Sequence, residues 1–263
     1  MSDARLPGRR SFGLDDRRNA SLLRASDVAC LSVPEGYGRW AQSYDCTPNP
    51  LLALEERYLT PILPDLAGKY ALDLACGTGR WLVRLLDGGA RAGIGVDRSA
   101  AMLGVAAGKS AISGRLVLAD CLELPFRTAT FDIALCSFAI NHIRDLKAMA
   151  RDLARVMKCN AQFFLCEQHP EAYLRGWRPG FRDVQSAVEI ETVHHSAEDV
   201  VECFQSDCFV CLKLHTLFFG EAERPIFLAM GKAGIFAAAC RVPAIQIYEL
   251  CRSDFVTAPL GTT

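Results

Sequence analysis

The residue types best suited to chemistry stand in a short glycine-containing run that starts at Asp73. From residue 73 to 79 the chain reads Asp-Leu-Ala-Cys-Gly-Thr-Gly, directly after an apolar segment that begins at Tyr70. Glycines at a strand-to-helix turn let the backbone approach a nucleotide-like ligand and adopt angles that other residues resist. A tight turn without a ligand would use the same residues, so the run favours ligand binding without deciding it.

Two acidic residues stand at the ends of the next two apolar segments. Asp97 ends one segment, and Asp120 directly follows the other. In the crevice beyond the strand ends, the first carboxylate can accept hydrogen bonds from ribose hydroxyls. The second can accept a hydrogen bond from an adenine amino group. Each residue can also be read as a solvated surface acid, but their register with the glycine run predicts an adenosine-containing ligand.

The spacing of the glycines narrows the kind of ligand. A dinucleotide fingerprint needs a third glycine three residues after the second, and that position holds Leu82. The lysine and serine of an ATP-type phosphate loop are missing after these glycines as well. An adenosine ligand with an uncharged linker remains, and a nucleotide-dependent oxidoreductase is disfavoured.

The elements that must position these residues alternate between short apolar strands and helices. This pattern is typical of an α/β fold, with a parallel sheet covered by helices on both faces. We expect strands at residues 70–75, 92–97, 116–119, 131–136, 161–167, 209–215 and 244–250. We expect helices at about 51–57, after Gly79, from the N-cap Ser99, at about 145–157, from Ser196, where a capping box begins, and from about Pro225.

Four segments in this order resemble the successive motifs of class I S-adenosylmethionine-dependent methyltransferases. They are residues 73–79, 95–103 (Gly-Val-Asp-Arg-Ser-Ala-Ala-Met-Leu), 119–126 (Ala-Asp-Cys-Leu-Glu-Leu-Pro-Phe) and 131–134 (Phe-Asp-Ile-Ala). The chain is most similar to the methyltransferase type 11 group, which includes the ubiquinone and menaquinone biosynthesis C-methyltransferases. The similarity covers residues 40–167. It implies S-adenosyl-L-methionine as the cofactor and a three-layer Rossmann-like sandwich, whose mainly parallel seven-stranded sheet has its last strand antiparallel.

The resemblance also implies which residues bind the cofactor. They are Tyr44, Asp73, Ala75, Gly77, Thr78, Gly79, Asp97, Arg98, Met102, Asp120, Cys121, Leu122 and Ser137. Among them, Asp97 would hold the ribose, Asp120 would hold the adenine, and Tyr44 would cap the cofactor. The chain departs from the family at two places, because Ala75 stands where many members have glycine and residues 158–161 (Lys-Cys-Asn-Ala) replace a Lys-Pro-Gly-Gly turn. We expect both departures to be tolerated, since Asn160 can adopt the left-handed conformation.

The segment from Ser137 to His142 lies where a methyl acceptor should approach. A histidine with a pKa near neutrality can take a proton from a hydroxyl or an activated carbon acid, so His142 is our candidate general base. Local packing or helix capping is an equally good interpretation of this residue. Further candidates are Glu167, Gln168, His169, His194 and His195, of which the last two are more simply explained as loop residues. Cys136 is better explained as a packed thiol than as a nucleophile.

Composition limits the partners. The formal net charge of −1 provides no positive field for nucleic acid, and the Asn-Pro-Pro-Tyr-type motif of amino-methylating enzymes is missing, so a small organic acceptor is favoured. No apolar run is long enough to span a membrane. The 12 cysteines indicate reduced thiols in a cytoplasmic protein, and Cys208 and Cys211 lie three apart on an expected strand, which is poor geometry for a metal; we expect none.

The chain divides into an arm, one large domain and a tail. We expect a partly disordered N-terminal arm at residues 1–39, the methyltransferase domain at 40–252 and a C-terminal tail at 253–263. Within the domain, residues 168–195 form an irregular insertion that we expect to act as an acceptor-side lid. A monomer and a homodimer both stay open, as does a catalytically silent domain that binds S-adenosylmethionine for regulation or scaffolding.

Overall fold

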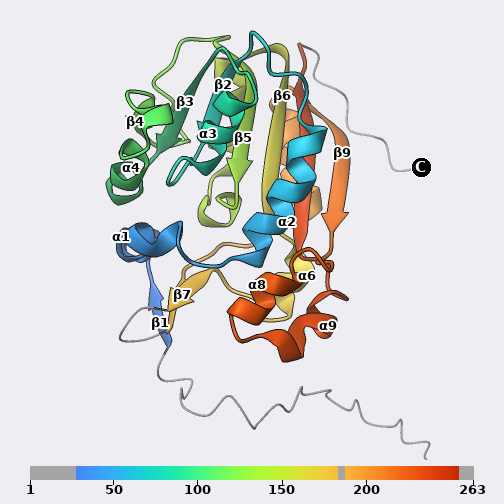
Figure 1. The fold of residues 1–263 in the computed structure, drawn as a ribbon. Helices are drawn as coiled ribbons and strands as arrows, with labels where there is room; N and C mark the ends of the chain where they lie inside the picture. Colours follow the sequence, from blue (N-terminus) through green and yellow to red (C-terminus); the bar gives the residue numbers. More distant parts are fainter. Residues whose placement is uncertain (1–27, 183–186, 255–263) are drawn as a thin grey trace, which may run out of the picture.

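A mixed sheet of seven strands forms the centre of the protein. The computed structural model describes residues 28–182 and 187–254. The strand order is β4-β3-β2-β5-β6-β10-β9 (Figure 1). The strands are β2 (Tyr70–Leu74), β3 (Ala92–Asp97), β4 (Leu116–Leu118), β5 (Phe131–Ser137), β6 (Met157–Gln168), β9 (Phe209–Leu217) and β10 (Ile245–Arg252). Strands β2 to β6 run parallel and β10 runs antiparallel to both of its neighbours, which confirms the fold class.

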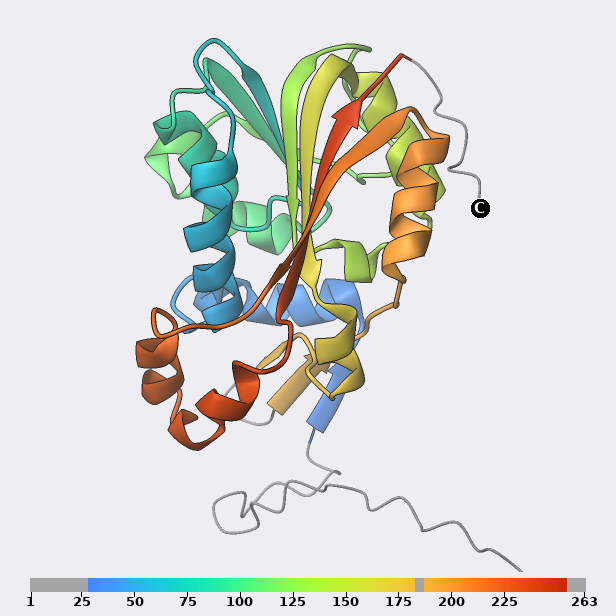
Figure 2. The same ribbon diagram turned by 90° about the vertical axis from the view of Figure 1, so that its right-hand side faces the viewer.

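Helices cover both faces of this sheet because its strands are apolar on both sides. Along β6, Phe163 and Leu165 face one core while Phe164 and Cys166 face the other. The first core includes α5 (Leu146–Val156) and α7 (Ala197–Ser206), and the second includes α2 (Pro50–Leu59) and α3 (Arg80–Asp87). Figure 2 shows α2 and α7 on opposite sides of the sheet.

Side-chain caps fix where several of these helices begin. Ser99 accepts a hydrogen bond from the Met102 backbone at the start of α4 (Ala100–Ala107). Ser196 and Asp199 form the expected capping box at the start of α7. Both predicted helix starts are therefore confirmed.

A second, smaller unit covers the carboxyl ends of the parallel strands (Figure 1). We call it the cap, and it consists of β1 (Val28–Leu31), α1 (Val33–Tyr44), β7 (Gly180–Arg182) and β8 (Ala187–Ile190). Its sheet has the order β1-β8-β7, with β1 parallel to β8 and β7 antiparallel to it. Helix α1 packs closely on β8 at Gly36, where an added Cβ would lie 2.7 Å from Ile190.

The structure of the cap differs from what the sequence predicted for residues 168–195 and for the boundary at residue 40. The irregular structure expected for residues 168–195 is wrong, because they contain α6 (Pro170–Leu174), β7 and β8. These strands are too short for a clear local pattern, and they are stabilised because β8 pairs with both β7 and the distant β1. Helix α1 also crosses the expected boundary at residue 40. The first 27 residues of the expected arm and residues 255–263 of the expected tail lie outside the described residues.

Two short helices lie between β9 and β10. They are α8 (Arg224–Ala229) and α9 (Phe236–Ala239), and a 3₁₀ turn separates them. The apolar stretch 226–240 thus folds against the sheet as broken helix, with Phe227 and Phe236 buried. Within residues 28–182 and 187–254, no helix has the length and apolar character needed to cross a bilayer.

Candidate cofactor and acceptor site

A cavity of about 670 Å³ lies between the carboxyl ends of the parallel strands and the cap. This volume is in the range of small-molecule sites. All but one of the predicted cofactor-binding residues line it, and so does His142. The exception is Gly79, which has a φ of 78° at the start of α3 and whose added Cβ would lie 2.3 Å from Ile112. Its position fits a role in the turn and in packing.

The glycine loop after β2 is tied to the end of β3. The backbone N–H of Gly77 donates to Asp97 Oδ2 at 2.7 Å, and that of Ser99 donates to Asp97 Oδ1 at 2.7 Å. Burial raises the pKa of Asp97, although these two donors stabilise its charged form. Asp97 therefore shapes the loop in addition to facing the cavity, a role that its sequence position does not reveal.

Ala75 adopts the left-handed conformation, with a φ of 54°. Such backbone costs a non-glycine residue about 1–2 kcal/mol. This explains why many members of the resembled family have glycine here. Asn160, the other departure, also has a positive φ of 61°, as expected.

Asp73 is a buried carboxyl group at the cavity wall. It is 2% exposed, and its Oδ2 accepts a hydrogen bond from the Leu82 backbone at 2.8 Å, which caps α3. Burial raises the pKa of Asp73 to about 7, so its ionisation near neutral pH depends on what lies beside it.

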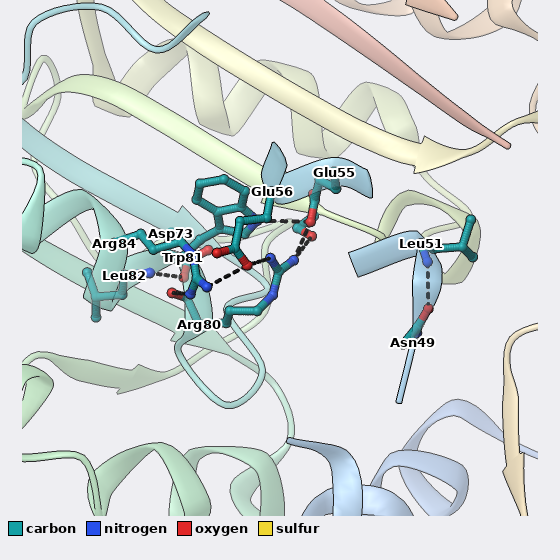
Figure 3. Close-up of polar contacts among 10 residues, drawn as sticks. Asn49, Leu51, Glu55, Glu56, Asp73, Arg80, Trp81, Leu82 and Arg84 are labelled. Atoms are coloured by element: carbon teal, nitrogen blue, oxygen red, sulfur yellow. Dashed lines mark hydrogen bonds and ion pairs between the residues drawn. The ribbon is translucent and has the colours of Figure 1, made fainter. Parts of the chain in front are cut away.

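Arg80, which the sequence analysis missed, begins α3 and also lines the cavity. Its Nη2 donates to the carboxylate of Glu55 on α2 (Figure 3). The same nitrogen donates to Ser137 Oγ at 3.1 Å. Glu55 is fully buried and also accepts a hydrogen bond from Trp81 Nε1 at 3.1 Å. An arginine directly after the glycine run could have indicated a residue of the site. Its pairing could not be predicted, because its partner Glu55 is distant in sequence.

The far end of the cavity is formed by the loop after β4 and by α4. Asp120, Cys121 and Leu122 line it, and Asp120 Oδ1 accepts from the Leu122 backbone at 3.0 Å. Burial raises the pKa of the Cys121 thiol to about 12, so it is neutral. Met102 supplies an apolar wall and is 2% exposed.

Helix α1 closes the cavity from the cap side. Tyr37 and Tyr44 line the cavity, and Trp40 stacks on Phe181 of β7 at a centroid distance of 5.1 Å. Just after α1, Asp45 accepts a hydrogen bond from Thr78 Oγ1 at 2.6 Å. The cap is thus attached directly to the glycine loop.

Lys109 strengthens this attachment. Its Nζ lies 2.7 Å from Asp45 Oδ2 and donates to the Thr78 carbonyl oxygen at 2.7 Å. We call these three residues, Asp45, Thr78 and Lys109, the latch. None of them is near another in sequence, so the latch exists only in the folded chain.

His142 lies in a 3₁₀ turn after β5 and has both ring nitrogens engaged. Nδ1 lies 3.0 Å from the Glu191 carbonyl oxygen, and Nε2 lies 2.9 Å from Tyr37 Oη. A carbonyl only accepts, so Nδ1 carries the proton and Nε2 of the neutral ring accepts from Tyr37. Burial lowers the pKa of His142 and raises that of Tyr37 well above its ordinary value, which keeps both groups neutral.

The other acid–base candidates, all of which lie in the described residues, do not line the cavity. Glu167 is 1% exposed and accepts from Tyr248 Oη at 2.6 Å, and burial raises its pKa to about 7. His169 caps α6, and Gln168 donates to the Trp177 carbonyl oxygen. His194 and His195 are likewise engaged locally.

Their contacts are specific. His194 stacks on Tyr173 at 5.4 Å, and His195 Nε2 lies 2.8 Å from the Ile143 carbonyl oxygen. Cys136 is fully buried, as expected for a packed thiol. In the part of the chain that the structure describes, no group of three or more histidine, cysteine or acidic residues is arranged to hold a metal ion.

The fold has relatives among solved structures. It is similar to a putative S-adenosylmethionine-dependent methyltransferase from Listeria monocytogenes, with a TM-score of 0.60 at 17% identity over 77% of this chain and 100% of that one. A second such methyltransferase, from Mesorhizobium loti, gives a TM-score of 0.61 at 18% identity over 78% and 100%. At these identities the likeness concerns the fold alone.

Sequence comparison gives matches to part of the chain. Residues 71–160 match the family described as a methyltransferase domain. The demethylmenaquinone methyltransferase of Bacillus licheniformis is 33% identical over 111 residues, 40% of this chain and 48% of the relative. The 2-phytyl-1,4-naphtoquinone methyltransferase of Synechococcus elongatus is 30% identical over 149 residues, 50% of this chain and 64% of the relative.

Residues 71–160 therefore match a methyltransferase domain, and the chain is distantly similar to the demethylmenaquinone and 2-phytyl-1,4-naphtoquinone methyltransferases named above. This match implies S-adenosyl-L-methionine as the cofactor, in agreement with the solved structures of the same fold. The matches span about half to less than two thirds of these relatives' lengths.

Proposed function

We propose that this protein transfers a methyl group from S-adenosyl-L-methionine to a small organic acceptor that gives up a proton. The observation that carries this proposal is a single cavity in which the predicted cofactor residues adjoin His142 and Tyr37. A silent binding domain would have no need for a neutral histidine directed at such a cavity. The thiols, if reduced, agree with a cytoplasmic location.

The cavity wall fits the cofactor from end to end. In this proposal Asp97 accepts hydrogen bonds from the ribose hydroxyls, since each of its oxygens has a second acceptor site beyond its backbone partner. Asp120 accepts from the adenine amino group, and Met102 packs on the ring. Tyr44 covers the cofactor from α1.

The acceptor side of the cavity has an apolar part. Its lining includes Val33 and Pro34 of α1, Phe138 and Ala139 after β5, and Val193 after β8. This lining suits a neutral, largely apolar acceptor. The relatives' names specify naphthoquinone compounds, which agrees with an acceptor of this chemical kind.

Residues 168–195 contribute Glu191 to Val193 to the same wall. They extend from β6 across the cap and return at the cavity rim, where an acceptor would enter. This placement supports the proposal that they act as the acceptor-side lid.

The cofactor supplies an electrophilic methyl group on a sulfonium. Holding the acceptor in line with that methyl group lowers the barrier mainly through positioning. The acceptor's proton passes to Tyr37 Oη as Tyr37 donates its own proton to His142 Nε2. The acceptor would thus exchange its proton for the methyl group, which would leave S-adenosylhomocysteine and the methylated acceptor as products. His142 then returns its proton to solvent.

Two measurements test this function. Calorimetry should show binding of both S-adenosylmethionine and S-adenosylhomocysteine, and each should raise the melting temperature by mass action. Labelled methyl groups should then transfer to a member of a panel of hydroxylated aromatics that includes naphthoquinols. Binding without transfer to any fraction of a cellular metabolite pool would support the silent domain instead. A response to NAD with none to either adenosyl ligand would contradict the family's chemistry.

A further inference from the structure

One aromatic residue at the cavity wall has a backbone conformation that its side chain disfavours. Phe138, directly after β5, has a φ of 52°. Left-handed backbone is uncommon outside glycine, and for a bulky residue it is an outlier. The other non-glycine residues with a positive φ in the described parts of the chain all have short side chains; they are Ala75, Ala129, Asn160 and Cys208. A large side chain is therefore exceptional at such a position in this protein.

The folded chain holds Phe138 in this conformation through its backbone and its side chain. The backbone N–H donates to the Cys166 carbonyl oxygen of β6 at 2.8 Å. Cys166 is fully buried, so this bond attaches Phe138 to the interior of the sheet. The partly buried side chain of Phe138 packs against the core that includes α2 and α3. Strained residues persist only where the surrounding structure determines them, and they cluster at functional sites.

Phe138 also lines the cavity, on the side where the acceptor would bind. Glycine would form the same turn without strain, but it would supply no side chain between the cavity and the core. The turn alone therefore does not explain an aromatic residue at this place. A ring that must stand at the cavity wall does explain it.

An aromatic ring at a cavity wall favours a planar ligand. Aromatic rings make offset-stacked or edge-to-face contacts with one another, and these contacts add to the free energy gained from apolar burial. A saturated ring of the same size gains from burial alone. Tyr37 and His142, whose ring centroids lie 5.3 Å apart, line the same cavity and provide polar atoms for a hydroxyl group. The wall thus suits a ligand with an aromatic ring and a hydroxyl group.

We propose that Phe138 selects a planar aromatic acceptor, whose ring contacts the Phe138 ring while its hydroxyl group faces Tyr37. This inference rests on the proposed function, because it concerns the acceptor of the same reaction. The backbone after β5 fixes where the Phe138 ring stands in the cavity. Phe138 therefore determines specificity and takes no part in the proton transfer.

The test compares two probes that share a fused-ring skeleton and one hydroxyl group. 2-Naphthol is planar and aromatic, whereas decahydro-2-naphthol is saturated and puckered. Calorimetry in the presence of S-adenosylhomocysteine gives the affinity for each probe. Phe138→Leu should lower the affinity for 2-naphthol roughly 2- to 12-fold, the loss expected for one aromatic pair. The affinity for decahydro-2-naphthol should stay unchanged, because leucine keeps an apolar wall.

Phe219→Leu is the matched control. Phe219 belongs to the same core, is 5% exposed and does not line the cavity. Both substitutions remove ring packing from this core and can lower the melting temperature. Only Phe138→Leu should change the ratio of the two probe affinities. Both variants should keep their affinity for S-adenosylhomocysteine, which shows that each one is folded.

The outcomes separate this specificity from the proposed function. Equal changes for both probes in Phe138→Leu, or no change for either, would overturn the role of Phe138 and leave the methyltransferase proposal standing. An unaltered protein that binds S-adenosylhomocysteine but not 2-naphthol would have the same consequence. A protein that does not bind S-adenosylhomocysteine would overturn the proposed function, and this inference with it.

Discussion

The two walls of the cavity are built in different ways. The cofactor wall comes from consecutive strand ends of one sheet, at residues 73–79, 97 and 120–122, and each segment is followed at once by its own helix or turn. The cap wall joins α1 to a strand pair in which Val28 lies opposite Ala187. The cofactor wall is therefore held mainly by contacts between residues close in sequence. The cap wall is held by contacts between residues far apart in sequence.

Because of this difference, we expect the cap wall to be less stable than the cofactor wall. The sheet is buried on both faces by large cores, whereas the buried core of the cap contains Trp40, Phe181, Val188 and Ile190. A small cluster opens at lower free energy than a large one. We therefore expect the cofactor wall to be rigid and the cap to open for ligands.

His142 gives the largest expected effect, because it is the point where the two walls meet. His142→Ala should reduce turnover roughly 10²- to 10⁴-fold through loss of the proton acceptor. Cofactor affinity should change far less, since ribose and adenine bind elsewhere in the cavity. Steady-state kinetics with an identified acceptor measures both. Normal turnover with a raised KM alone would mean that the ring only shapes the pocket.

The pH dependence of turnover also tests His142 as the general base. His142 must be neutral to accept a proton, and burial lowers its pKa, so turnover should be level near neutrality and fall as the pH drops through that lowered value. Tyr37→Phe removes the first member of the proposed relay and should lower turnover as well. In the activity that remains, the neutral ring has lost a donor that stabilises it, so the acid limb should move to higher pH. Tyr44→Phe, at a residue about two helical turns further along α1, is the control and should leave the limb in place. An unmoved limb in Tyr37→Phe would contradict the relay.

Trp40 tests whether the cap is a separately stabilised unit. Trp40→Ala removes its stack on Phe181 and should cost about 3–5 kcal/mol, the range for a buried aromatic side chain. We expect faster hydrogen exchange in β1 and β8, with β2 and β5 unchanged. Trp177→Ala, which loses a stack on Phe219 outside the cap, should not affect β1. Uniformly faster exchange across both sheets would show that the cap and the sheet unfold together.

Asp97 tests the cofactor wall. Asp97→Ala should cost about 1.5–3 kcal/mol of cofactor binding through loss of a charge-assisted hydrogen bond. The structure adds a second effect, because the Gly77 and Ser99 backbone groups also lose their acceptor. We therefore expect a lower melting temperature without ligand as well. Calorimetry and thermal melts separate the two effects, and unchanged affinity would remove Asp97 from the ribose site.

The latch gives the smallest expected effect, because Asp45 and Lys109 are partly exposed. Asp45→Asn keeps an oxygen for Thr78 and loses the ion pair, a change of about 0–1 kcal/mol. Dissociation of S-adenosylhomocysteine, followed by stopped flow, should become faster by at most about fivefold. High salt should have a similar effect on the unaltered protein and little on the variant. A slower rate in the variant would show that the latch does not hold the cap closed.

The sequence by itself determined the sheet and the cofactor wall. The strands from Tyr70 to Ser137 and the caps at Ser99 and Ser196 appear where local patterns placed them. The residues that the family resemblance implied for the cofactor all line the cavity except Gly79. These features were predictable because the carboxyl ends of parallel strands share one edge. A residue that follows a strand is therefore placed in the site by its position in the chain.

Only the tertiary structure decided the cap, the latch and the partners of the charged groups. Strand β1 has four residues and no partner within its own segment, and the pairing of His142 with Tyr37 spans 105 residues. In the sequence, Glu55 is indistinguishable from the other acids of an amphipathic helix. Only the folded chain shows that it pairs with Arg80. Such contacts depend on how separate elements dock, and docking is set by burial and packing of the whole chain rather than by the local order of residues.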